Sequence, residues 1–148
     1  MEPQINADER GSEEKPEYLY EGLTKRIIGV FYEVYNELGH GFLESVYHKA
    51  MVLALRQAGL QVESCVPVPV WFRGELVGAF EADIVVERTV LLELKAAKAL
   101  ESAHEAQTLN YLRATPIEVG LLLNFGPKPQ VRRFAFANTR KHPRATVL

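Results

Sequence analysis

The sequence of 148 residues contains one cysteine, Cys65, so neither an internal disulfide nor a zinc site built on thiolates is available to it. No apolar run approaches the roughly 18 residues that a membrane-spanning helix requires. The acidic N-terminal segment does not match a secretory signal, and no glycine-rich phosphate loop indicates use of ATP. No serine or cysteine hydrolase pattern is present, since Cys65 lies in a proline-flanked segment without an evident histidine partner. These absences leave a cytoplasmic location as the default expectation.

Charge is distributed unevenly along a chain whose composition, 47% hydrophobic and 24% charged, is that of an ordinary globular protein. The formal net charge is −2, but the first 20 residues hold six acids and two basic residues. From residue 128 onward there is no acid, and there are six basic residues: Lys128, Arg132, Arg133, Arg140, Lys141 and Arg144. This basic segment is either a phosphate-contacting surface or a solvated tail, and charge alone does not separate the two.

The hydrophobic pattern predicts a single α/β domain, a mixed central β-sheet flanked by helices. Residues 1–19 lack apolar periodicity and are expected to be disordered, residues 20–137 form the folded domain, and residues 138–148 form a basic tail. The expected order is two helices, three strands, a third helix and two more strands. The strand and third-helix bounds are Val62–Phe72, Leu76–Glu87, Val90–Ala96, Glu101–Arg113, Glu118–Phe125 and Val131–Phe136. Pro67 and Pro69 indicate that the first strand is an edge or bulged strand.

The second and third predicted strands form a hairpin that carries charged residues on an otherwise apolar ribbon. If the turn centres near Thr89, Asp83 lies opposite Lys95 and Val85 lies opposite Glu93. Side chains alternate along a strand, so Asp83, Glu93 and Lys95 then share one face. The other face is apolar and is formed by Ile84, Val86, Leu92 and Leu94.

Two interpretations of this charged face are open. Antiparallel sheets often expose one face to water, and a Glu–Lys pair there needs no function. Alternatively, a pair of carboxylates converges on a hard cation such as Mg²⁺, with a lysine beside it to stabilise charge on a phosphate.

Four motifs in order resemble one protein superfamily. Asp83, followed ten residues later by Glu93-Leu94-Lys95, resembles the PD-(D/E)XK nucleases. The segment 41–47, Gly-Phe-Leu-Glu-Ser-Val-Tyr, matches the name motif of the GxxExxY branch, and Gln107 with Tyr111 is similar to the Gln-xxx-Tyr helix motif of RecB-type members. Position 82 is alanine where the superfamily name has proline. The resemblance covers roughly residues 20–137 and implies a restriction-endonuclease-like core.

The resemblance also implies roles for individual residues. A divalent cation, Mg²⁺ or Mn²⁺, would be held by Asp83, Glu93, the Leu94 carbonyl and, directly or through water, Glu44. Lys95 would orient or activate the attacking water, and Gln107 and Tyr111 would line the site. The implied activity is hydrolysis of nucleic-acid phosphodiester bonds, DNA before RNA. The rivals are a non-cleaving nucleic-acid-binding module and a regulatory subunit with the same fold. Specificity would then come from a partner or from a homodimer.

Each candidate residue outside the hairpin also has a purely structural interpretation. Tyr47 and Tyr111 have apolar neighbours at helical spacing, so both are equally expected to pack in the core with a bonded hydroxyl. Gln107 suits a buried amide satisfied by backbone, and Gly41 suits a turn between helices. Glu44 has neighbours that place it near the buried side of its helix, where an unpaired carboxylate is costly.

Three histidines, His40, His48 and His104, lie in the predicted helices or beside them and are candidate metal ligands by residue type. His40 and His48 flank Glu44 at four-residue spacing, but no second His/Cys cluster completes a transition-metal site. His104, near the start of the third helix, is expected to have a surface role.

Overall fold

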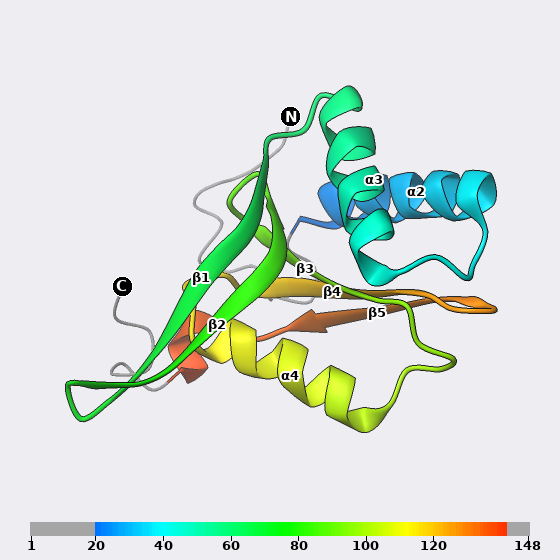
Figure 1. The fold of residues 1–148 in the computed structure, drawn as a ribbon. Coiled ribbons are helices and arrows are strands. Elements are labelled where there is room, and N and C mark those ends of the chain that lie inside the picture. Colours follow the sequence, from blue (N-terminus) through cyan, green and yellow to red (C-terminus); the bar gives the residue numbers. More distant parts are fainter. Residues whose placement is uncertain (1–19, 142–148) are drawn as a thin grey trace.

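The computed structural model describes residues 20–141, so the expected disordered segment 1–19 and Arg144 lie outside the described residues. A five-stranded sheet has helices on both faces (Figure 1). The elements follow one another as α2 (Glu21–Leu38), α3 (Glu44–Gln57), β1 (Val62–Phe72), β2 (Glu75–Val86), β3 (Val90–Lys95), α4 (Ser102–Arg113), β4 (Val119–Phe125), β5 (Pro129–Ala135) and a short 3₁₀ helix, η2 (Asn138–Arg140). The predicted order and the mixed α/β class are therefore confirmed.

The strands lie in sequence order across the sheet, β1-β2-β3-β4-β5. All neighbours are antiparallel except β3 and β4, which are parallel. Parallel neighbours need a long crossover connection, and α4 provides it by packing across the face opposite to α2 and α3. The chain therefore runs from the end of β3 into α4, which packs against β3.

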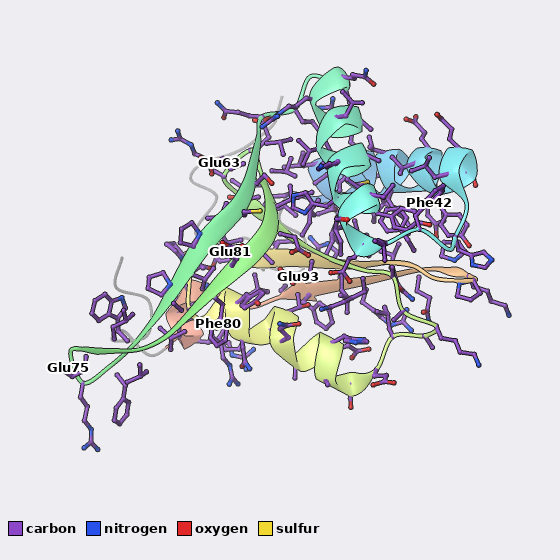
Figure 2. The ribbon with its side chains drawn as sticks, viewed as in Figure 1. Phe42, Glu63, Glu75, Phe80, Glu81 and Glu93 are labelled. Atoms are coloured by element: carbon purple, nitrogen blue, oxygen red, sulfur yellow. The ribbon has the colours of Figure 1, made fainter. Side chains whose placement is uncertain are left out.

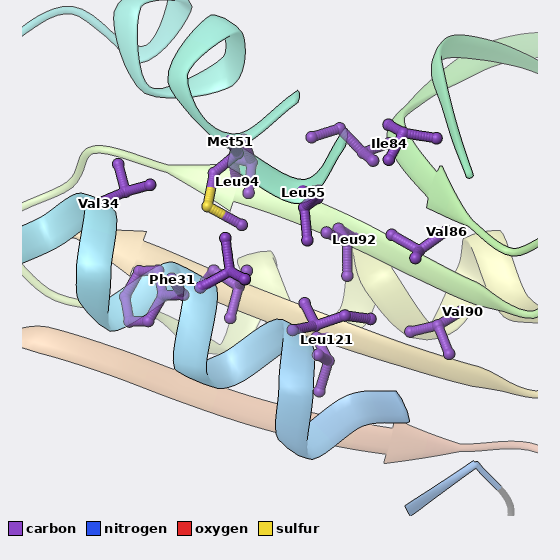
Figure 3. Close-up of a cluster of buried hydrophobic side chains, with 14 of the residues drawn as sticks. Phe31, Val34, Met51, Leu55, Ile84, Val86, Val90, Leu92, Leu94 and Leu121 are labelled. Carbon is purple, nitrogen blue, oxygen red and sulfur yellow. The ribbon is translucent and has the colours of Figure 1, made fainter. Parts of the chain in front are cut away.

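Strands β3 and β4 are buried because helices cover them on both sides. All seven residues of β4 are buried, as expected for its nearly continuous apolar sequence. On one face, Leu94 and Leu121 pack with Phe31 of α2 and Met51 of α3 (Figure 3). The other face carries a smaller cluster under α4, the α4-side cluster: Val68, Ala82, Val85, Leu91, Tyr111, Leu112 and Ala114.

The proline-containing strand β1 lies at the edge of the sheet, as its sequence predicts. Its pairing with β2 also shifts between Val70 and Trp71. Within residues 20–141, no helix is both long and apolar enough to cross a membrane.

Candidate functional site

The hairpin of β2 and β3 has a different register from the one its sequence suggested. Val86 pairs with Val90, Val85 with Leu91 and Ile84 with Leu92, so Val85 does not face Glu93. The turn centres on Arg88 rather than Thr89, because Glu87 and Arg88 both adopt positive φ values of 52° and 59°. Moving the centre by one residue shifts every pair by two positions, which leaves each side chain on its expected face. The pairing prediction was wrong in register.

Beyond Ile84 and Leu92, backbone pairing between β2 and β3 stops and two carboxylates take its place. The Asp83 N–H donates to Oε1 of Glu93 at 3.1 Å, and the Leu94 N–H donates to Oδ2 of Asp83 at 2.7 Å. Each acid is thus held by the backbone of the opposite strand. The second oxygen of each carboxylate accepts no hydrogen bond from any residue between 20 and 141.

Burial makes this acid pair expensive to ionise. Glu93 is only 3% exposed, and burial together with the charge of Asp83 raises its pKa to about 8. Burial also raises the pKa of Asp83, against the hydrogen bond from Leu94. Lys95, at the end of β3, lies close enough to favour the ionised form of both acids. The hairpin therefore holds two carboxyl groups in an environment that opposes their ionisation, and a bound cation would favour the ionised form of both.

Glu44 approaches the acid pair from α3. It lines a pocket of about 330 Å³ together with Asp83 and Leu94, and its charge adds to the burial and the Asp83 charge that raise the pKa of Glu93. Contrary to expectation, its side chain is exposed. It lies one turn before Tyr47 on the buried stripe of α3, at the helix end. The helix begins at Glu44, so the buried stripe ends there and the side chain is exposed to solvent.

Helix α4 supplies Gln107 and Tyr111. Nε2 of Gln107 donates to the Tyr111 hydroxyl at 3.1 Å. Burial, and after it the charge of Glu93, raises the pKa of Tyr111, so this ring lies near the acids while packing in the α4-side cluster. The structural interpretation of Tyr111 is therefore confirmed, and its role at the site stays a prediction. Tyr47, in contrast, is fully buried and its hydroxyl donates to the Gly39 carbonyl, which places it in the core.

Two further residues border the site that sequence reasoning did not place there. His48 and Cys65 line the pocket with Asp83, and the charge of His48 opposes the burial that raises the pKa of Asp83. Nε2 of His48 lies 2.6 Å from Oγ of Ser64. The available signal was the spacing of four residues between Glu44 and His48 on one helix. His104 has a local role, since its Nδ1 accepts from the Glu101 N–H in the cap of α4.

Three basic residues of the described part of the basic segment, Arg132, Arg133 and Lys141, do not form a single phosphate-contacting surface. Lys141 is 8% exposed and donates to the carbonyls of Thr115 and Ile117, both at 2.7 Å. Arg132 forms an ion pair with Glu105 of α4, 3.6 Å from Nε to Oε2. Its neighbour Arg133 lines a pocket with residues of α2 instead. Successive side chains of β5 point to opposite faces of the sheet, so Arg132 and Arg133 are separated. The ammonium group of Lys141 is bonded to backbone carbonyls.

The oxygen atoms at the hairpin are suitable ligands for a hard divalent cation. Carboxylate oxygens of Asp83 and Glu93, the Leu94 carbonyl and Glu44 are all oxygen donors, the type that Mg²⁺ and Mn²⁺ prefer. Across residues 20–141, no three His, Cys, Asp or Glu side chains converge as a ready-made metal cage. Mg²⁺ commonly uses one or two carboxylates and completes its shell with water and substrate phosphate, so the set is sufficient for it.

Comparisons with known proteins identify the family and the fold. A sequence profile described as the PD-(D/E)XK nuclease superfamily matches residues 21–134. No curated protein matches the chain. A solved structure titled "Crystal structure of SSO0001" has the same fold, with a TM-score of 0.51, 17% identity, and coverage of 80% of this chain and 60% of that one. This chain therefore spans about three-fifths of the length of that relative. Because the profile match covers most of the sequence, the chain belongs to the PD-(D/E)XK nuclease superfamily.

Proposed function

We propose that the chain is a divalent-metal-dependent nuclease of the GxxExxY branch that hydrolyses phosphodiester bonds, with DNA as its preferred substrate. The observation that carries the proposal is the reciprocal bonding of Asp83 and Glu93 to the opposite strand, with Lys95 beside them. A protein without a cation to bind gains nothing from placing a buried carboxyl, Glu93, beside a second acid, Asp83, whose charge raises its pKa. The preference for DNA rests on the similarity of Gln107 and Tyr111 to the RecB-type helix motif.

In this proposal the residues have separate tasks. Asp83, Glu93 and the Leu94 carbonyl hold the cation, and Glu44 completes the set directly or through water. When bound, a divalent cation supplies positive charge to the phosphate oxygens and acidifies water.

The other side chains serve the reacting water and the geometry. The Lys95 ammonium orients the attacking water and stabilises charge that develops on the phosphate. Gln107 and Tyr111 close the site from α4 and limit access of bulk water to the acids.

The test compares cleavage by wild-type protein with that by Lys95→Ala and Glu93→Gln. Supercoiled, linear and single-stranded DNA, and RNA, are incubated with the full chain in Mg²⁺ or Mn²⁺. We expect each substitution to reduce cleavage by about 100-fold or more, because each removes a charge that acts on the transition state. Glu75→Gln is the matched control, since this acid is exposed at the start of β2 and should cleave as wild type does.

Two outcomes would contradict the proposal. Cleavage that persists in both site variants would show that Asp83, Glu93 and Lys95 are not the catalytic centre. Salt-sensitive binding of nucleic acid without cleavage by the wild type would favour the non-cleaving binding module. Thermal unfolding of each variant confirms that a loss of cleavage is not a loss of fold.

A further inference from the structure

Phe80 is an aromatic side chain that remains half-exposed close to the candidate site. It is 49% exposed on β2, three residues before Asp83 (Figure 2). Its strand partner is Val68, a member of the α4-side cluster, so Phe80 points toward the α4 face of the sheet. Its ring centroid lies 5.8 Å from that of Tyr111, at an angle of 46°.

Tyr111 connects this exposed ring to the acid pair. Burial and then the charges of Glu93 and Asp83 act on the Tyr111 hydroxyl, while Phe80 contacts the ring of the same residue. An accessible aromatic surface therefore lies one side chain away from the candidate cation ligands. About half of the Phe80 side chain is thus buried against Tyr111 and the other half is accessible from solvent.

Acidic groups outnumber basic ones among the charged groups that act on the acid pair. Besides Asp83 and Glu93 themselves, Glu44 and Glu81 raise the pKa values, Lys95 and His48 oppose them, and Lys49 lines the same pocket. Lys141 is committed to backbone carbonyls and Arg132 is paired with Glu105. A base can instead stack on an aromatic ring without any cation, and such stacking contributes much of the affinity for single strands.

We propose that Phe80 stacks on an unpaired base adjacent to the scissile phosphate, so that the chain selects single-stranded nucleic acid. This inference rests on the proposed nuclease function and names its substrate class. In a duplex, each base is already stacked on its neighbours and its face is closed to the protein, whereas an unpaired base can be splayed onto the ring. The buried ring of Tyr111 contacts the Phe80 ring and links it to the side of the sheet on which the acids lie.

Binding is measured first, in the Lys95→Ala background, so that cleavage does not consume the probe. Fluorescence anisotropy follows a labelled single-stranded oligothymidine and a blunt duplex of equal length with Mg²⁺, over a series of salt concentrations. Phe80→Ala and Phe80→Leu should weaken single-strand binding by about 5- to 100-fold. The slope of log affinity against log salt should not change, because no phosphate contact is removed.

Three comparisons make the result specific to stacking. Phe80→Trp should retain the affinity, whereas Phe80→Leu keeps an apolar side chain but lacks the ring. Phe72→Ala is the matched control. Phe72 is 56% exposed at the end of β1, beside the turn into β2, and its ring contacts Arg73. Duplex binding should be insensitive to all four substitutions.

The proposal is overturned if Phe80→Ala binds the single strand as tightly as native Phe80 does, or if Phe80→Leu keeps the native affinity. It is also overturned if Phe72→Ala weakens binding as much as Phe80→Ala does. Cleavage by the chain with native Lys95 separates the two proposals. Affinity that depends on Phe80 without cleavage of any substrate would refute the nuclease function alone. Cleavage that depends on Lys95 but not on Phe80 would refute the stacking alone.

Discussion

The carboxyl group of Glu93 is almost completely buried beside Asp83, and this determines how the stability of the metal-free protein depends on pH. Its pKa is about 8 in the fold, against 4.5 for an ordinary glutamate. Between those values the folded state binds more protons than the unfolded state, so stability falls as pH rises. The loss ends once pH exceeds the folded value, because Glu93 is then ionised in both states.

We therefore expect the free energy of unfolding in EDTA to decrease from pH 5 to pH 8, by at most about 1.4 kcal/mol per pH unit from this one group. Glu93→Gln should flatten the dependence, because an amide does not titrate. Urea unfolding at four pH values measures the slope. An unchanged slope in Glu93→Gln would show that the buried carboxyl is not the group responsible.

At the scale of elements, the segment between β3 and α4 is held by β4 rather than by its own structure. Asn124 is fully buried; its Oδ1 accepts from the Ala97 N–H at 2.9 Å, and its Nδ2 donates to the Ala97 carbonyl at 3.0 Å. Asn124 is also the β4 partner of Lys95. Gln130 of β5 extends the network to the Leu100 N–H. The chain leaving Lys95 is thus clamped before it enters α4.

Gly126 belongs to the same clamp and allows a stability test. A Cβ added there would meet the Ala97 carbonyl oxygen and lie 2.9 Å from Nδ2 of Asn124. We expect Gly126→Ala to destabilise the fold by about 1–3 kcal/mol, because the Ala97 backbone and the buried, hydrogen-bonded side chain of Asn124 both resist movement. Gly29→Ala in α2 is the control: nothing lies within 4 Å of its Cβ, and an exposed helical position should gain about 0.5–1 kcal/mol.

Urea unfolding of the two alanine variants and the wild type measures both effects. Similar stability changes at positions 126 and 29 would contradict the clamp. Lower cleavage in Gly126→Ala, at a temperature where it remains folded, would further indicate that the clamp positions Lys95.

On the scale of the whole molecule, the site lies where both helical layers reach one hairpin: α3 contributes Glu44 from one face and α4 contributes Tyr111 from the other. A cation bound there would favour the folded state, because an unfolded chain does not hold these oxygens together. At about 100 times its Kd, Mg²⁺ should raise the free energy of unfolding by about 2.7 kcal/mol.

Thermal unfolding with and without Mg²⁺ tests this linkage without reference to cleavage. We expect Asp83→Asn and Glu93→Gln to abolish the stabilisation, and Glu75→Gln to retain it. A wild-type protein whose midpoint does not respond to Mg²⁺ or Mn²⁺ would contradict the assignment of these residues as ligands.

Local patterns in the sequence were sufficient for the elements and for part of the site. Periodicity of 3.6 or 2 determines which face of a helix or strand is apolar, so the order of elements and the edge position of β1 could be predicted. The side on which Asp83, Glu93 and Lys95 lie also depends only on alternation. That is why an error of one residue in the turn left the prediction of their shared face unaffected.

Contacts between distant segments were decided only by the tertiary structure. The hydrogen bonds from the Asp83 N–H to Glu93 and from the Leu94 N–H to Asp83 form where β2 leaves the ladder. The exposure of Glu44 depends on where α3 begins, and the burial of Lys141 depends on carbonyls more than 20 residues away. None has a local pattern, because each depends on how elements pack. The sequence alone determines which chemical groups this protein carries and on which face of each element. Packing of α3 and α4 around the hairpin decides which of those groups meet.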